Sequence, residues 1–582
     1  MTTALNIDHS VTGQPWRWRR PPDDSLAMDA LVDELLLARG VPREDLPRHR
    51  EPRIRDFLPD PSCFSDMEKG AERLADAIQS GETIAIFGDY DVDGATSAAL
   101  LTLLLRRLGS DPIVYIPDRL MEGYGPSGKA LVELKARGAA VAVCVDCGAQ
   151  AHDALFEAKA ADLDVIVVDH HQCANLLPVA HALINPNRPD ESADGAAHGH
   201  LAAVGMAFLL GVALLRELRG RSVFDGRDEP KILDLLDLVA LGTVADVARL
   251  KTLNRAFVTQ GLKVMGARQN IGMAALIEAS RLTKAPSCRD LGFALGPRIN
   301  AGGRVGKSDL GVRLLTSTDP AEARTIAVEL DRLNEERRAI EMIVTDQATL
   351  QASRLDGPVI TVMSPGWHQG VIGIVAGRLK EVFGRPAIVI AETEDGTGKG
   401  SGRSIFGVDL GAAVLAAKES GLLIAGGGHA MAAGLTLPPG GIEPFREFIN
   451  ERLANDVEKS RSDRALLLDA LLAPGGVAAA LCDALDSAGP YGAGWPQPRV
   501  AAGPVRLLKT GIVGDGHVRG IGCGDDGKSF KWIAFRSAGS ALGQALLESG
   551  RDARWWLAGT IKRDEWNGGN AAEMHVEDAA LA

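Results

Sequence analysis

The chain has 582 residues, more than a single hydrophobic core organises, and this length predicts about three or four domains. Hydrophobic residues make up 46% and charged residues 24%, which is typical of a globular protein. The net charge of -13 excludes a nucleic-acid binder that is basic over its whole surface, but it is compatible with a local basic channel.

The seven cysteines are odd in number and scattered, which favours a reducing compartment such as the cytoplasm over a disulfide framework. Cys144 and Cys147 form a C-x-x-C pair, for which packing in a buried strand is favoured over a redox or zinc site. No signal peptide is evident. The longest uncharged apolar run, 201–215, is shorter than a membrane span of about 18 to 20 residues and predicts a core helix.

Residues 1–64 form an N-terminal extension, rich in Pro, Arg and Asp, that we expect to wrap the following domain. It contains a helical pattern over 28–39 and the cluster Trp16-Arg17-Trp18-Arg19-Arg20. This cluster could contact nucleic acid. Tryptophans anchored on the core, with solvated arginines, are the favoured interpretation.

Within residues 65–318, predicted strands at 83–87, 112–116, 140–145 and 164–168 alternate with helical patterns. This alternation predicts a parallel sheet covered on both faces. The first strand leads into Asp89, Asp91 and Asp93, and a helix is expected over 95–107, with Gly88 and Gly94 letting the backbone turn. Three adjacent carboxylates repel one another unless cations lie between them, and divalent ions with oxygen ligands are the usual solution.

Acidic or histidine residues also follow three more predicted strands. The run 141–145 leads to Asp146, the run 165–168 leads to Asp169, His170 and His171, and the run 235–241 precedes Asp246. Taken singly, these residues could be a helix cap, a core histidine or a turn residue. Because the carboxyl ends of parallel strands share one edge of a sheet, the set together predicts a site for two metal ions about 3.5–4 Å apart.

Residues 292–309 are glycine-rich and basic. The Gly-Lys-Ser at 306–308 lacks the preceding glycine that a P-loop requires, so a nucleoside triphosphate site is rejected. The backbone amides of this stretch, with Arg298, Arg304 and Lys307, suit the phosphates of a nucleic acid instead. The highly charged stretch 319–350 predicts a helix that connects two domains.

A second α/β domain is predicted over 351–458, with glycine loops at 366–373, 398–404 and 426–429 that either approach a sugar-phosphate or only form tight turns. Residues 459–582 predict a small OB-like barrel, with strands at 499–507, 516–522, 530–535, 553–561 and 572–576. Most tryptophans of this part are expected in the barrel core, with one or two exposed to stack bases: Trp495, Trp532, Trp555, Trp556 and Trp566.

Several motifs resemble those of a known family. Gly-Asp-Tyr-Asp-Val-Asp-Gly, Val-Asp-Cys-Gly, Asp-His-His and Gly-Thr-Val-Ala-Asp, in this order, resemble the DHH phosphoesterase superfamily. Gly-Gly-Gly-His429 resembles its DHHA1 partner domain. The stretches 116–125 and 296–301, with the terminal barrel, are similar to the RecJ family of bacterial single-strand-specific DNA exonucleases. The resemblance implies two parallel-sheet α/β domains, DHH and DHHA1, joined by a long helix and followed by an OB-like barrel.

The resemblance also implies roles for individual residues. The implied metal ligands, for two Mn²⁺ or Mg²⁺ ions, are Asp91, Asp93, Asp146, His170 and Asp246. The implied catalytic residues are Asp89 and His171 at the same centre, and Asp169, which would fix the metal loop or a histidine tautomer. The implied substrate-binding residues are Arg119, Ser401 and Arg403 for a 5′ phosphate, Tyr124 for the terminal nucleotide, Arg298 and Arg304 for the strand, and His429. Several family members have His where this chain has Phe87, so one ligand is absent.

The implied function is a cytoplasmic, monomeric 5′ to 3′ exonuclease that degrades single-stranded DNA to 5′ mononucleotides in repair and recombination. A single-strand-binding protein and a RecQ-type helicase are implied partners, and no membrane is involved. Two alternatives are weighed. A small-substrate relative acting on short oligonucleotides or cyclic dinucleotides would lack the extension and the barrel. A non-catalytic replication scaffold would have lost acidic ligands, which are intact here apart from the Phe87 position.

Overall fold

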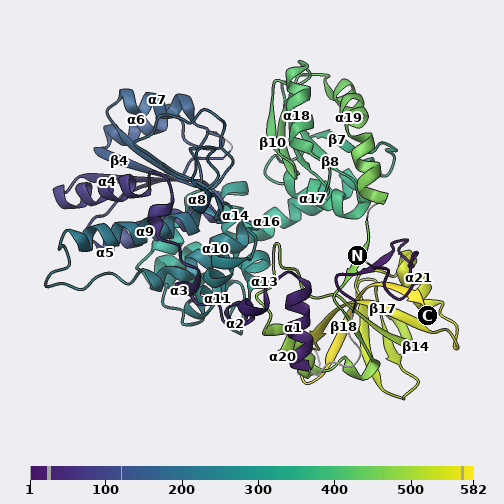
Figure 1. Ribbon diagram of the computed structural model, residues 1–582. Helices are drawn as coiled ribbons and strands as arrows, with labels where there is room; N and C mark the ends of the chain where they lie inside the picture. The colour runs from purple at the N-terminus through teal and green to yellow at the C-terminus, as the bar shows by residue number, and fades with distance from the viewer. Residues whose placement is uncertain (1, 22–27, 120, 463, 565–568) are drawn as a thin grey trace. The chain divides into compact units, whose positions relative to one another are not determined.

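The computed structural model describes residues 2–21, 28–119, 121–462, 464–564 and 569–582 (Figure 1). Trp566 lies outside the described residues. The chain divides into two compact units, one made of residues 1–56 with 464–582 and the other of residues 57–463. Among the described residues, no helix has the length and apolar character needed to cross a bilayer.

The larger unit begins with a five-stranded, all-parallel sheet in the order β3-β2-β4-β5-β6. Its strands are β2 (Thr83–Gly88), β3 (Ile113–Tyr115), β4 (Ala139–Val145), β5 (Asp164–Val168) and β6 (Ala182–Ile184). The central strands are almost wholly apolar and buried, as expected for a sheet covered on both faces. The predicted strands and sheet type are confirmed, and β6 was not predicted.

Helices cover both faces of this sheet (Figure 1). On one face lie α6 (Gly128–Ala136) and α7 (His152–Ala160). On the other lie α4 (Met67–Ser80), α5 (Val92–Arg107) and α9 (Ala203–Gly220), which contains the apolar run predicted to be a core helix. Phe87 is wholly buried in the core on the α6 side, with its ring stacked on Tyr115 at 5.4 Å.

The expectation of a strand over 235–241 is wrong, because this run forms the helix α10 (Leu236–Ala245) after a short 3₁₀ turn, Ile232–Leu235. Residues 236–243 are all buried, and a short run that is apolar except for Asp237 is compatible with either a buried helix or a buried strand. Asp246 therefore follows the end of a helix, not the end of a strand. Six helices follow it: α11 (Thr252–Gly266), α12 (Ile271–Ala279), α13 (Cys288–Asp290), α14 (Gly296–Val305), α15 (Leu310–Thr316) and the 33-residue α16 (Pro320–Ala352).

The glycine-rich stretch predicted as a phosphate-binding loop is helical as well. A π-helical turn, Leu291–Leu295, continues into α14, so most backbone amides of this stretch are used within helices. Its glycines serve close packing instead. A Cβ on Gly303 would lie 2.9 Å from the Tyr90 carbonyl oxygen.

A second sheet has the order β10-β11-β9-β8-β7. Only β7 (Ile360–Pro365) and β8 (Ala387–Glu392) run parallel, so this sheet is mixed. The antiparallel strands are β9 (Gly398–Arg403), β10 (Ala425–His429) and β11 (Ala432–Leu437), and the helices are α17 (Ile372–Phe383), α18 (Leu410–Glu419) and α19 (Ile442–Ser462).

The C-terminal strands close into a five-stranded barrel, because β14 pairs with β17 as well as with β15. The barrel strands are β14 (Val500–Val513), β15 (His517–Cys523), β16 (Ser529–Ala534), β17 (Trp555–Arg563) and β18 (Ala572–Leu581). This confirms the predicted OB-like barrel. Trp495, Trp532 and Trp555 are buried, as expected for core residues.

The N-terminal segment completes this same unit. Its strand β1 (Trp16–Trp18) pairs in parallel with β12 (Leu466–Leu468), and α1 (Met28–Ala38) contacts α20 (Ala479–Asp486). Residues 1–56 thus belong with the C-terminal elements, and only the end of the predicted extension, such as the 3₁₀ turn Pro61–Cys63, packs on α4 and α9 of the next domain. Trp16 is wholly buried and its indole N–H donates a 2.9 Å hydrogen bond to Asp578, which confirms the anchoring interpretation.

We expect Trp16→Phe to destabilise this unit by about 1–3 kcal/mol, because the buried Asp578 carboxylate loses a donor. Differential scanning calorimetry of the full chain measures the effect as a lower Tm. Trp18→Phe is the matched control, since the structure shows no hydrogen bond from the Trp18 indole to a described residue. Equal shifts in the two variants would show that the hydrogen bond contributes nothing.

Candidate metal centre and arginine group

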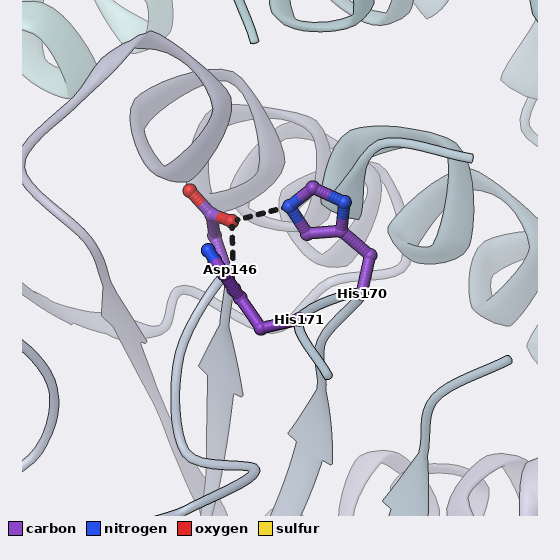
Figure 2. A group of neighbouring side chains, drawn as sticks. All are labelled: Asp146, His170 and His171. Carbon is purple, nitrogen blue, oxygen red and sulfur yellow. Dashed lines mark ion pairs between the residues drawn. The ribbon is translucent and has the colours of Figure 1, made fainter. Parts of the chain in front are cut away.

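Acidic and imidazole side chains from four segments meet at the carboxyl edge of the first sheet. These residues form three groups, and within each group the ligand atoms lie within 4.8 Å of one another. The groups are Asp146, His170 and His171; Asp93, His170 and Asp246; and Asp89, Asp91 and Asp146. In Figure 2 both imidazoles approach the carboxylate of Asp146 from the end of the neighbouring strand. The structure thus brings together every residue expected at the metal centre.

Two helix starts hold these carboxylates in place. Asp91 caps α5, because its Oδ1 accepts hydrogen bonds from the backbone N–H of Asp93 (2.8 Å) and Gly94 (3.1 Å). The carboxylate of Asp93 accepts from the N–H of Ala203 (2.7 Å) and Val204 (2.9 Å), the first residues of α9. A helix start stabilises negative charge, so these contacts with α9 favour the ionised form of Asp93.

Gly94 is required for close packing rather than for a turn. It lies in the first turn of α5 without a positive φ, and a Cβ there would lie 2.7 Å from the Cα of Asp89. Only a hydrogen at this position lets the Asp89 backbone approach the helix start.

The carboxylates are crowded and buried. Burial and neighbouring carboxylates raise the pKa of Asp89, Asp146 and Asp246, and burial with the charge of Asp91 raises the pKa of Asp93 to about 7. Three buried atoms of this centre make no hydrogen bond among the described residues: Asp89 Oδ1, Asp146 Oδ1 and His170 Nε2. Buried oxygen and imidazole ligands that face one another without hydrogen-bond partners fit divalent cations.

The two histidines differ in charge. Burial, followed by the charge of His171, lowers the pKa of His170 to about 4, so His170 is neutral and can act as a ligand. Burial opposes protonation of His171 too, but the 2.7 Å hydrogen bond to Asp169 raises its pKa to about 9. Asp169 also accepts from the N–H groups of His170, His171 and Ala149, and it thereby fixes the loop that carries both imidazoles.

Tyr124 lies beside this ion pair. Its hydroxyl is 3.3 Å from His171 Nδ1 and donates to the carbonyl oxygen of Asp146 at 3.1 Å. The Tyr124 ring meets the Tyr90 ring edge to face at 6.5 Å, and the guanidinium of Arg119 lies 4.9 Å above the Tyr90 ring. Tyr90 was not predicted as a site residue. Its place between Asp89 and Asp91 in the sequence was the available signal.

A second charged cluster, the arginine group, adjoins the metal centre and consists of Arg119, Arg304 and Arg403. Burial, followed by the charges of Arg119 and Arg337, lowers the pKa of Arg304 to about 10. Burial and Arg119 also lower the pKa of Arg403. Guanidinium groups that are partly buried and close to one another repel each other unless an anion lies between them, so this cluster indicates an anion site.

Ser401 and the start of α17 complete the surroundings of Arg403. Arg403 donates to the Ser401 hydroxyl at 3.2 Å, and a Cβ on Gly373 would lie 2.9 Å from the same hydroxyl oxygen. Arg304 donates to the carbonyl oxygen of Gly370 at 2.8 Å. The N-terminus of α17 therefore faces the same anion site.

Two predicted substrate-binding residues are placed differently. Arg298 is held by Asp331 of α16 through a hydrogen bond of 2.9 Å and an ion-pair contact of 2.8 Å, and it therefore braces α14. His429 is exposed at the end of β10. Among the described residues, it makes no hydrogen bond or ion pair with the metal centre or the arginine group.

Comparison with known proteins identifies the family. Residues 83–243 match the N-terminal domain of the DHH family, residues 356–455 the DHHA1 domain and residues 468–578 the RecJ OB domain. The single-stranded-DNA-specific exonuclease RecJ of Salmonella typhimurium is 39% identical over 518 residues, which cover 86% of this chain and 88% of that protein. The chain belongs to the RecJ family. Escherichia coli RecJ is 38% identical over 86% of this chain and 88% of its own length.

Solved RecJ structures agree in fold. RecJ of Thermus thermophilus in complex with Mn²⁺ has a TM-score of 0.77 at 28% identity, covering 95% of this chain and 75% of that one. The Mg²⁺ complex of the same protein has a TM-score of 0.72 at 27% identity, covering 95% and 74%. The fold class, the metal-dependent hydrolase class and the choice of Mn²⁺ or Mg²⁺ expected from the sequence are confirmed.

Proposed function

We propose that the protein is a single-stranded-DNA exonuclease that works from the 5′ end by two-metal hydrolysis and releases 5′ mononucleotides. The observation that carries this proposal is the metal centre with the arginine group directly beside it. Arg119 connects the two, since it lies over Tyr90, and Tyr90 lies between Asp89 and Asp91. The metal centre suits two cations with the scissile phosphate between them, and the arginine group suits the phosphate at the end of a strand.

Asp91, Asp93, Asp146, His170 and Asp246 would hold two Mn²⁺ or Mg²⁺ ions, with Asp89 and His171 at the same centre. When bound, such ions would lower the pKa of a water molecule and neutralise charge on the leaving 3′ oxygen. The bond between phosphorus and this 3′ oxygen would break as the water oxygen bonds to the phosphorus, and the proton that the water gives up would be balanced by one taken up by the 3′ oxygen. The remaining strand therefore keeps a 5′ phosphate.

His171 and Asp169 would act on the phosphate from the protein side. The protonated His171 donates one ring N–H to Asp169, which leaves Nε2–H to donate to a phosphate oxygen. Asp169 orients this ring and keeps its charge. Tyr124, at 56% exposure, would contact the terminal nucleotide with the open face of its ring.

The arginine group with Ser401 would bind the terminal 5′ phosphate, since these side chains offer charged donors in a partly enclosed space. Each turnover regenerates a 5′ phosphate on the shortened strand, so the same residues would receive it again. Arg298 would contact the strand only if it left Asp331, and His429 would do so from its exposed position on β10.

The proposal includes cytoplasmic action as a monomer in DNA repair and recombination. The seven cysteines are all free, which supports a reducing compartment. A helicase of the RecQ type would supply single strands, and a single-strand-binding protein would present them. Polarity is tested with strands labelled at one end. A label at the 5′ end is expected to appear in mononucleotides at the first turnover. If a label at the 3′ end were released first, the proposed direction would be refuted.

We expect Arg403→Ala to reduce the preference for a 5′-phosphorylated over a 5′-hydroxyl strand by about tenfold, because one charge-assisted contact with the phosphate is lost. Initial rates on the two strands measure the preference. Arg378→Ala, on the exposed side of α17, is the matched control. Equal loss on both strands, or no loss on either, would contradict the proposed role.

A further inference from the structure

A cavity of about 480 Å³ opens beside the metal centre. It shares His170 and Asp246 with the metal centre, and its other walls are the loops 196–201 and 247–251. None of the residues predicted to bind the 5′ end lines it. The ring of His170 thus contacts the ring of His171, with 4.6 Å between the ring centroids, and it also lines the cavity.

The mouth of the cavity is positively charged. Arg249 and Lys251 line it and are both exposed, and neither forms an ion pair within the part of the chain that the structure describes. The charge of Lys251 acts on His200, which also lines the cavity: burial, followed by this charge, lowers the pKa of His200 to about 4. Asp246, a proposed metal ligand, is the one carboxylate among the described lining residues.

The loop that carries both cations is firmly fixed. Val247 and Thr252 have φ values of 61° and 43°, which β-branched residues adopt only when the surroundings impose them. Asn254 donates from its side chain to the carbonyl oxygens of His200 (2.7 Å) and Arg249 (3.1 Å), and so ties the two loops together. The backbone that carries Arg249 and Lys251 is therefore held at a set position relative to Asp246.

We propose that this cavity binds the phosphate one nucleotide to the 3′ side of the bond being hydrolysed, through Arg249 and Lys251. The inference rests on the proposed 5′ to 3′ direction. With the terminal phosphate on the arginine group and the scissile phosphate on the metals, the retained strand leaves on the opposite flank. A cavity of 480 Å³ lies within the range of about 300–1,000 Å³ that small ligands occupy, and so accepts one nucleotide unit.

The test uses strands with one neutral methylphosphonate at the second linkage from the 5′ end, compared with unmodified strands. Release of the first nucleotide is measured with excess enzyme and Mn²⁺. For the wild type we expect the neutral linkage to slow release about tenfold, because a charge-assisted contact is lost. The double variant Arg249→Ala/Lys251→Ala is expected to be about tenfold slower on unmodified DNA and to show no further loss from the neutral linkage.

The double variant Lys69→Ala/Arg324→Ala removes two exposed cations elsewhere in the same unit and is expected to behave as the wild type. A cavity variant that keeps the wild-type rate, or that is still slowed tenfold by the neutral linkage, would overturn the inference. A wild type insensitive to this linkage would also overturn it. Strands with the neutral linkage second from the 3′ end separate the two proposals, since sensitivity only there would refute the direction itself.

Discussion

Asp146→Asn is expected to slow nucleotide release from single-stranded DNA by about a thousandfold or more, which corresponds to ~4 kcal/mol of lost transition-state stabilisation. Asp146 belongs to two of the three groups of ligand atoms, so its neutralisation weakens the attraction for both cations. The measurement is the release of labelled nucleotides with saturating Mn²⁺. Undiminished release would reject the assignment of the metal centre.

The same variant has a second expected property, which separates lost chemistry from lost folding. Without metal ions, Asp146→Asn should have a Tm equal to or above that of the wild type, because a buried carboxylate among like charges is removed. Mn²⁺ should raise the Tm of the wild type and raise that of the variant less. Asp237→Asn, at the opposite end of α10 from Asp246 and outside the ligand groups, is the buried control that should retain activity.

Gly94→Ala is expected to abolish most activity and to destabilise the larger unit, although alanine normally favours a helix over glycine by about 1 kcal/mol. The added methyl group would lie 2.7 Å from the carbonyl carbon and from the Cα of Asp89. Because both neighbours are backbone atoms, relief requires the Asp89–Asp93 segment to move. Activity and Tm should therefore fall together.

Gly377→Ala provides the opposite case. Gly377 lies inside α17, and a Cβ there would meet nothing within 4 Å. We expect a gain of about 0.5–1 kcal/mol in stability with unchanged activity. If Gly94→Ala were as well tolerated as Gly377→Ala, the close approach at the metal centre would have no role.

The metal centre was predictable because parallel strands impose its geometry. Once 83–87, 140–145 and 164–168 are assigned as parallel strands, Asp89, Asp146 and His170 must emerge at one edge, and the structure brings them together. Asp246 was included for the wrong reason. Its preceding run is apolar except for Asp237 and is buried throughout residues 236–243, and such a run does not reveal whether it is a strand or a helix.

Other features depend on packing that no local pattern encodes. Arg298 is predicted to contact the strand, and its partner in the structure, Asp331, lies 33 residues further along the chain, where no local pattern points to it. Tyr90 gains its position from Arg119 and Tyr124 across the site. The cationic loop at Arg249 and Lys251 has no motif, and only the folded cavity makes it noticeable.

The pairing of β1 with β12 sets an order for biosynthesis. Residues 16–18 leave the ribosome early, but their partners at 466–468 are translated some 450 residues later, after the whole larger unit. At about 5–20 residues per second, this first segment waits for roughly 20 to 90 seconds with Trp16 and Trp18 uncovered. Nascent chains should therefore need a chaperone at this end, and a circular permutant that joins the two termini should need it less.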